Sequence, residues 1–181
     1  IQTDILHQYY DVPITHNIVS ELFDYYKLGK HLDICCFDNY PANSWLKKIG
    51  EENYGPALST DIMRGIKNKN FWVMEEQSGP CGWEVVGRAL RPGEIKLWTY
   101  QTMAHGAEAV VYFRWRTCLF GTEQYWHGIL DHDGKPRRRY NEIKEIGSTF
   151  PKVSKYNINS KVAADIFMIR DFEQQWSHEF Q

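Results

Sequence analysis

The chain has 181 residues, enough for one domain but too few for a complete eightfold α/β barrel, which needs about 250. Its 21 basic and 23 acidic side chains give a net charge of -2, so no overall positive field draws it to nucleic acids or anionic membranes. We therefore expect neither of these partners.

The sequence shows neither a targeting signal nor a metal-binding pattern of cysteines. The sequence has no apolar run of about 18 residues and no basic stretch followed by an apolar core at its start, so it predicts neither a membrane span nor a secretory signal. Its four cysteines show no Cys-x-x-Cys pair and no zinc-binding Cys/His spacing. We expect reduced thiols, no metal site, no cofactor and a cytoplasmic protein.

Short apolar runs recur along the chain with helical patterns between them. The runs cover residues 12–15, 33–37, 71–74 and 109–113. Such alternation is typical of successive β-α units in a parallel sheet. It predicts an α/β fold with four parallel strands near Ile14, Ile34, Val73 and Val111, adjacent in that order.

Three helices are predicted from apolar stripes at helical spacing. After the third run, Pro92 stands at a plausible first helical position and Gly106 is a stop signal. The stripe between them consists of Ile95, Trp98, Thr102 and Met103. A second stripe, before the third run, contains Leu58, Ile62, Met63 and Ile66, and a third, after the fourth run, contains Tyr140, Ile143, Ile146 and Phe150.

The last part of the sequence predicts a second domain. Pro151 and the polar stretch 154–161 have the composition of a linker, and residues 162–169 are apolar and β-prone. We expect 162–169 to be the first strand of a domain that the chain does not complete. A four-stranded parallel sheet also leaves two unpaired edges, which invite association, so the chain reads as half of something larger.

Polar groups follow the third and fourth predicted strands directly. The apolar run 71–74 ends in Glu75 and Glu76, and the fourth run leads into Arg114 and Arg116. The carboxyl ends of parallel strands face the functional site in α/β sheets and barrels, so a glutamate there is a catalytic candidate. A solvated loop residue is the commoner explanation of a single such glutamate.

Two chemically rich loops come after the fourth strand. Residues 121–128 combine rings with Glu123 and His127, a composition that suits a monosaccharide pocket, because hydroxyls bind carboxylate and imidazole while the apolar sugar face packs on a ring. The alternative is a structural loop whose Glu and His face water. We interpret 131–134 as an Asp-Gly turn rather than a metal cluster, and the basic run 135–139 as a solvated face.

These segments resemble glycoside hydrolase family 42, the microbial β-galactosidases. The resemblance runs from about residue 13 to residue 150 and is carried by the order and spacing of 37–41, 72–75, 106–108, 112–116 and 123–130. It implies a retaining β-galactosidase whose catalytic eightfold α/β barrel is followed by a trimerisation domain.

The resemblance assigns the chain to the C-terminal half of a TIM (β/α)8 barrel, strands five to eight. Residues 1–153 would be the half-barrel, and 154–181 the linker and the start of the following domain. Glu75 matches the nucleophile at the end of strand seven, and Glu76 stands where the family often has Gln. Trp83 matches the ring that lines the galactose subsite, and Glu123 and His127 match groups that hold galactose hydroxyls. Tyr40, at the end of strand six, is a weaker match.

The family's acid/base glutamate has no counterpart here. It lies in an Asn-Glu pair at the end of strand four, and nothing before Thr15 supplies that pair, while Asn141 and Glu142 open the last helix. The zinc-binding cysteines of some members would also lie outside this chain. We expect the isolated chain to be inactive, and the whole protein to be a homotrimer that acts on β-galactosides.

Two other functions remain open at the sequence level. The same rings and carboxylates could form a non-catalytic carbohydrate-binding module, which a chain that folds alone would favour. A related retaining glycosidase with another sugar preference would use the same nucleophile and differ only in its contacts to the sugar hydroxyls.

Overall fold

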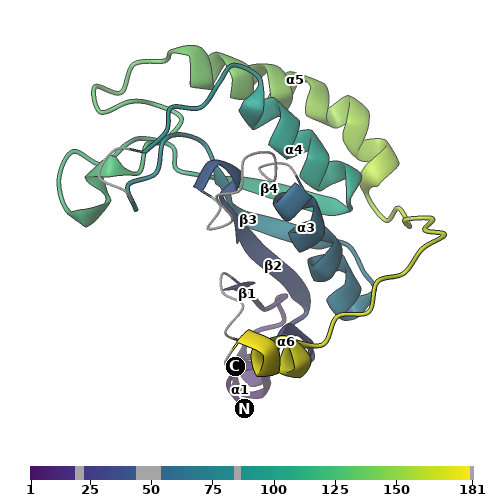
Figure 1. Cartoon of the computed structure of the whole chain (residues 1–181). Coiled ribbons are helices and arrows are strands. Elements are labelled where there is room, and N and C mark those ends of the chain that lie inside the picture. Colours follow the sequence, from purple (N-terminus) through teal and green to yellow (C-terminus); the bar gives the residue numbers. More distant parts are fainter. Residues whose placement is uncertain (19–22, 44–53, 84–86, 180–181) are drawn as a thin grey trace.

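A computed structural model of the chain describes residues 1–18, 23–43, 54–83 and 87–179 (Figure 1). In these residues four strands form one sheet, and α3, α4 and α5 lie on one of its faces. The elements in chain order are α1 (Gln2–Tyr9), β1 (Thr15–Ile18), α2 (Tyr25–Gly29), β2 (Ile34–Asn39), the 3-10 turn η1 (Pro41–Asn43), α3 (Tyr54–Lys67), β3 (Phe71–Gln77), α4 (Glu94–Ala104), β4 (Ala107–Phe113), the 3-10 turn η2 (Thr122–Tyr125), α5 (Arg138–Asn157) and α6 (Phe172–Glu179).

The strands are parallel and lie in the order β1-β2-β3-β4. This confirms the predicted strands and their order, although β1 begins at Thr15 rather than at residue 12. Pro13 has no N–H to donate to a ladder, and the N–H of Ile14 donates to the Asp33 carboxylate at 2.7 Å. The regular pairing with β2 therefore starts only at Thr15.

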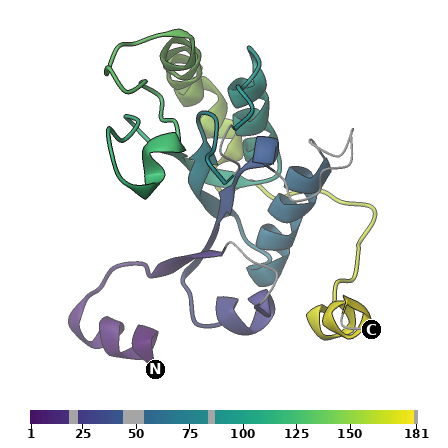
Figure 2. The same ribbon diagram turned by 60° about the vertical axis from the view of Figure 1, so that its left-hand side comes forward.

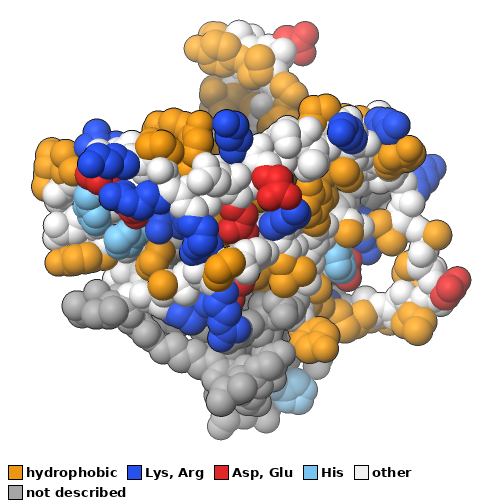
Figure 3. Space-filling view, turned by 90° about the horizontal axis from the view of Figure 1, so that it is seen from above, with side chains coloured by type: hydrophobic (Ala, Val, Ile, Leu, Met, Phe, Trp, Pro, Cys, Tyr) orange, Lys and Arg blue, Asp and Glu red, His pale blue; other side chains and the backbone are white. Residues whose placement is uncertain are grey.

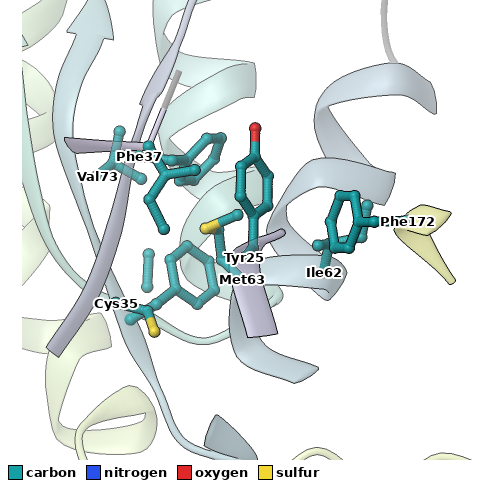
Figure 4. Close-up of a cluster of buried hydrophobic side chains, with 10 residues drawn as sticks. Tyr25, Cys35, Phe37, Ile62, Met63, Val73 and Phe172 are labelled. Carbon is teal, nitrogen blue, oxygen red and sulfur yellow. The ribbon is translucent and has the colours of Figure 1, made fainter. Parts of the chain in front are cut away.

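The main core lies between the sheet and the helices that cover it (Figure 4). Alternate residues of a strand point to the same face, and Phe71 and Val73 of β3 are both fully buried on the helical side. The cluster around them comprises Ile18, Tyr25, Cys35, Phe37, Ile62, Met63, Ala107 and Phe172. Ile62 and Met63 come from the stripe that predicted α3, so that prediction is confirmed.

A second cluster joins α4 to α5. Ile95 and Trp98 of α4 pack with Leu90 and with Ile146 of α5, which confirms both predicted stripes. α4 begins at Glu94 rather than at Pro92, because Gly93 takes a positive φ of 87° and forms the N-cap. A backbone in that region cannot continue into the first helical turn from Pro92.

The C-terminal part differs from the prediction. α5 continues through Pro151 to Asn157, and the Asn157 amide donates to the carbonyl of Ala107 at the start of β4, so 154–157 are helix rather than linker. Residues 162–169 form no strand, and Ile169 is 95% exposed. A strand needs a neighbour for its backbone groups, and the described residues supply none here.

The arrangement of the sheet sets the place of the site. The loops after β3 and β4 lie together at the upper left of Figure 1, whereas α1 and α6 lie at the opposite end and apart from each other (Figure 2). Among the described residues, β1 and β4 each pair with a single strand, so both are edges. None of the helices described is long and apolar enough to cross a membrane.

Candidate active site

Glu75 and Glu76 occupy different environments at the end of β3. Glu75 is partly exposed, and its Oε2 accepts a hydrogen bond of 2.5 Å from the hydroxyl of Tyr40. Glu76 is 0% exposed, and the amide of Asn39 donates to both its oxygens at 3.2 and 3.0 Å. β3 has one extra residue between Val73 and Glu76 relative to both neighbouring strands. The alternation that buries Phe71 and Val73 is therefore shifted, so that Glu76 is buried while Glu75 stays partly exposed.

Burial controls the protonation of the groups around Glu75. It raises the pKa of Glu76 to about 8, with the Asn39 amide acting in the opposite direction. Burial, and then the neighbouring Glu75, raise the pKa of Asp38 to about 7, against a 2.8 Å hydrogen bond from the Asn17 amide. The same two causes raise the pKa of the Tyr40 hydroxyl well above its usual range. Tyr40 is therefore a neutral donor to Glu75 at neutral pH.

A row of aromatic rings extends outward from Glu75. The ring of Tyr40 meets that of Trp83 edge to face, with centroids 4.9 Å apart, and Trp83 meets Trp126 in the same way at 5.5 Å. Trp83 is 45% exposed, so its ring is available to stack on a sugar. Sequence reasoning missed Trp126, although its place directly before His127 in a ring-rich loop was a usable signal.

The loop that carries Glu123 and His127 is closed at its base. Thr117 donates its N–H, and also its hydroxyl, to the carbonyl of Leu130, while the N–H of Gly128 donates to the Thr117 hydroxyl. These bonds are buried, and they join the two ends of the loop. Glu123 and His127, the two predicted sugar-binding residues, therefore lie on one loop after β4 whose ends are hydrogen-bonded to each other.

Glu123 is held by an arginine rather than left in water. Arg114 Nη1 donates to Glu123 Oε2 at 2.9 Å and to the Cys118 sulfur at 2.7 Å. The hydrogen-bonding partner of Glu75 is Tyr40, not Arg114. Arg114 comes directly after β4 and turns toward the loop, which the sequence alone does not reveal.

His127 lies beside an acidic residue and a second histidine. Its Nδ1 is 3.9 Å from Asp131 Oδ1, and its ring meets that of His132 edge to face at 5.2 Å. Burial, and then Arg139 and His132, lower the pKa of His127, so the ring is neutral at neutral pH. Viewed from above, basic, acidic and histidine side chains gather at the left of the molecule (Figure 3).

The loops after β3 and β4 are bonded to each other. The N–H of His127 donates to the carbonyl of Pro80 at 2.9 Å. A Cβ on Gly82 would lie 2.5 Å from the Tyr125 Cβ, and one on Gly79 would lie 2.4 Å from the His127 carbonyl oxygen. Two glycines therefore allow the loop before Trp83 to pack on the loop of His127.

The Asp-Gly segment forms a turn, as its composition predicts. Gly134 has a φ of 72° and its N–H donates to the carbonyl of Asp131. Asp131 pairs with Arg137 and Arg139, and within the described residues no cluster of His, Cys, Asp or Glu could hold a metal ion. The basic run is only in part a solvated face, because the Arg139 side chain is 15% exposed and donates to the Gly128 carbonyl.

The site residues that the resemblance brought together fall into two groups. Glu75, Tyr40 and Trp83 form one continuous contact chain, and Glu123 and His127 lie on the neighbouring loop. All four cysteines are free thiols, three of them buried. The arrangement brings a carboxylate, a half-exposed indole ring and further polar side chains together beyond the ends of β3 and β4.

Comparisons with known proteins point in the same direction. The family model described as β-galactosidase, glycoside hydrolase family 42, matches residues 1–153. The β-galactosidase BgaA of Clostridium cellulovorans is 40% identical over 158 residues, which make up 84% of this chain and 24% of that protein. BgaH of Haloferax lucentense is 33% identical over 179 residues, covering 93% of this chain and 26% of that protein.

Solved structures agree with the sequence relatives. The β-galactosidase from Bacillus circulans sp. alkalophilus has a TM-score of 0.87 and 29% identity, covering 98% of this chain and 26% of that one. The β-galactosidase from the psychrophilic Marinomonas ef1 has a TM-score of 0.85 and 28% identity, covering 99% of this chain and 31% of that one. The chain spans about a quarter of the length of the curated relatives given above.

Proposed function

The chain belongs to the β-galactosidases of glycoside hydrolase family 42, and from this premise we propose that it is part of a retaining enzyme that hydrolyses terminal β-D-galactosides. Its parallel sheet is part of an α/β barrel, and we assign β1 to β4 to barrel strands five to eight. Glu75 is the nucleophile in this proposal. The observation that carries it is the carboxylate of Glu75 at a strand end, bonded to the hydroxyl of Tyr40, whose ring contacts Trp83.

The chemistry assigned to Glu75 follows from its surroundings. In a retaining glycosidase an ionised carboxylate attacks the anomeric carbon and forms a glycosyl-enzyme that water then hydrolyses. The hydroxyl of Tyr40 holds one carboxylate oxygen of Glu75 at 2.5 Å, which fixes the rotation of the group and leaves the other oxygen for attack. Glu76 is excluded from this role because it is fully buried.

The neighbouring groups form the galactose subsite in this proposal. Trp83 offers a half-exposed ring to the apolar face of the sugar. Glu123 supplies a carboxylate acceptor, and neutral His127 supplies a ring nitrogen for a hydroxyl. Asp131 lies on the Nδ1 side of His127, which favours a proton there and leaves Nε2 as an acceptor.

The remaining parts of the enzyme lie outside this chain. A retaining mechanism needs a second carboxyl about 5 to 5.5 Å from the first, and we place that acid/base residue in the other half of the barrel. We assign residues 1–153 to the barrel and 154–181 to the connection with the next domain, and we propose a homotrimer for the whole protein. The four free thiols suit the reducing cytoplasm.

Covalent trapping tests the assignment of the nucleophile. The full-length protein would be treated with a 2-deoxy-2-fluoro galactoside that carries an activated leaving group, which slows the second step and lets the glycosyl-enzyme accumulate. Peptide mass spectrometry should find one sugar on Glu75. The Glu75→Gln variant should show neither label nor turnover of a chromogenic β-galactoside.

The same experiment separates the other possibilities. A label on Glu76 would move the nucleophile by one residue. Binding of the galactoside without any turnover by the wild-type protein would contradict an enzyme and support a carbohydrate-binding module. Faster turnover of glucosides or arabinosides than of galactosides would keep the glycosidase and change its substrate.

A further inference from the structure

We propose that Arg114 is a positioning residue that fixes the Glu123 carboxylate for one hydroxyl of the sugar and so contributes to the selectivity for galactose. This inference rests on the proposed galactosidase function. Its basis is a single guanidinium nitrogen, Arg114 Nη1, that donates both to Glu123 Oε2 at 2.9 Å and to the Cys118 sulfur at 2.7 Å.

Arg114 is held by the end of β4 and by the end of the loop where the chain returns. It follows Phe113, the last residue of β4, and its guanidinium carbon lies 4.8 Å from the centroid of the Phe113 ring. Its carbonyl accepts a 2.7 Å hydrogen bond from the N–H of Ile129, where the chain returns from the loop. These contacts place Arg114 at the base of the loop that carries Glu123.

Arg114 contacts only one of the two carboxylate oxygens of Glu123. Oε2 is bonded to Arg114, whereas Oε1 accepts no hydrogen bond from any residue that the structure describes. The Glu123 side chain is 51% exposed and that of Arg114 is 29% exposed. One oxygen is thus anchored, and the other is an open acceptor whose direction is fixed by the first.

A fixed acceptor distinguishes sugars that a freely rotating one would not. Galactose and glucose differ only in the orientation of one hydroxyl, so discrimination requires an acceptor held in one place. An ion pair as exposed as this one adds only about 0.2 to 1 kcal/mol to folding stability. Replacing Arg114 should therefore change sugar selectivity far more than folding stability.

Kinetics on deoxy sugars test the proposal in the full-length enzyme. Arg114→Met and Glu123→Gln would be compared with wild type on p-nitrophenyl β-galactoside, its monodeoxy analogues and the β-glucoside. Arg114→Met should lower kcat/KM for the galactoside roughly tenfold, the size of one hydrogen bond to a charged group. The loss should shrink toward onefold on the analogue that lacks the hydroxyl bound by Glu123. The same analogue should be insensitive to Glu123→Gln, and the galactoside-to-glucoside ratio should fall in both variants.

Two matched variants complete the design. Lys96→Met breaks an exposed ion pair with Glu145 on α4 and α5, away from the site, and should leave every kinetic ratio unchanged. Arg114→Lys keeps the charge but not the fork geometry, and should recover part of the activity.

Different results would contradict the proposed galactosidase function and the proposed role of Arg114. No galactoside turnover by wild type would refute the proposed function itself. Equal losses for Arg114→Met on the parent sugar and on every deoxy analogue, or additive effects in the Arg114→Met, Glu123→Gln double variant, would show a general structural role and overturn the assignment of Arg114.

Discussion

Two adjacent carboxyl groups at the end of β3 lie in different surroundings. Glu75 accepts from a neutral phenol at the open face, whereas Glu76 is fully buried, with the Asn39 amide as its donor. Burial raises the pKa of Glu76 to about 8, so it is a neutral acid at pH 7. On the proposal that Glu75 is the nucleophile, a neutral Glu76 beside it avoids repulsion between two carboxylates.

Replacing Glu76 tests this protonation state. The folded protein holds the Glu76 proton up to about pH 8, whereas the unfolded chain releases it near 4.5. Stability therefore falls as pH rises from about 4.5 to about 8. Glu76→Gln removes this loss, and the variant should become more stable than wild type by an increasing amount, on the order of a few kcal/mol at alkaline pH. Thermal unfolding at pH 5 and pH 8.5 measures it.

The exposed carboxylate of Glu145 is the matched control. It pairs with Lys96 on the helical surface, and Glu145→Gln should shift the unfolding temperature little at either pH. A constant difference between Glu76→Gln and wild type across the pH range would show that Glu76 is already ionised in the folded protein.

The two residues that we propose to bind sugar hydroxyls should contribute unequally to activity. Glu123→Ala in the full-length enzyme should lower kcat/KM for galactosides by roughly tenfold or more, because a charged acceptor that strengthens in the transition state is lost. His127→Ala should act in the same direction but more weakly, because its neutral ring makes a weaker bond. Kinetics on a chromogenic galactoside measure both. Unchanged kcat/KM in Glu123→Ala would make Glu123 a solvated loop residue.

The sequence indicates some site residues and hides others for a physical reason. A glutamate after an apolar strand, and a glutamate and histidine in a ring-rich loop, are visible because their positions depend on local pattern. The contacts of Arg114 with Glu123, and of Trp126 with Trp83, depend on the path of two loops in space. Sequence spacing carries no information on that path.

Among the elements, the loops after β3 and β4 act as one unit. The loop before Trp83 packs on the loop of His127 through the Pro80 carbonyl and through Gly82, where a side chain would meet Tyr125 and Trp126. A Cβ at Gly82 would overlap these side chains, so only glycine allows the two loops to approach this closely. The placement of Trp83, the proposed stacking ring, therefore depends on the glycine directly before it.

Alanine substitutions at two glycines test this dependence. In Gly82→Ala the new Cβ would lie 2.5 Å from the Tyr125 Cβ, so the loops must separate and Trp83 must move. We expect kcat/KM for galactosides to fall about tenfold or more, since misplacement of about 1 Å is costly. Steady-state kinetics on the full-length enzyme measure the change.

Gly65 in α3 is the control position, where we expect alanine to leave activity unchanged. A Cβ there meets nothing within 4 Å, and Gly65→Ala should stabilise the helix by about 0.5 to 1 kcal/mol without changing kcat/KM. If Gly82→Ala proves as harmless as Gly65→Ala, the two loops do not depend on this contact.

The predicted elements differ in accuracy according to what forms them. β2, β3, α3 and α4 lie close to their predicted positions because they bury an apolar face that the sequence pattern records. The prediction that the helix ends before Pro151 was wrong. α5 continues past Pro151 to Asn157, whose side chain bonds to Ala107 across the fold. α6 was not predicted, and its Phe172 is buried against Tyr25 in the main core.

At the scale of the whole molecule, the sheet has one covered face and two open edges. β1 and β4 have a single partner strand each among the described residues, and open edges are sites of association. Apolar side chains such as Val111 on β4 and Ile169 in the segment before α6 are exposed. These features suit the proposed half-barrel, and the chain spans about a quarter of the length of the curated relatives.

The last prediction concerns the isolated 181-residue chain, which should show no β-galactosidase turnover. A nucleophile alone lacks the proton donor, which contributes about 10² to 10⁴-fold, and it lacks the part of the pocket that the other barrel strands would supply. Hydrolysis of a chromogenic galactoside by the purified chain measures this, with Glu75→Gln chain purified in parallel to detect host enzyme. Turnover that Glu75→Gln abolishes would reveal an acid/base residue within these residues. Activity that appears only when the preceding part of the full-length protein is added would instead support the assignment of the two catalytic carboxyls to different halves of the barrel.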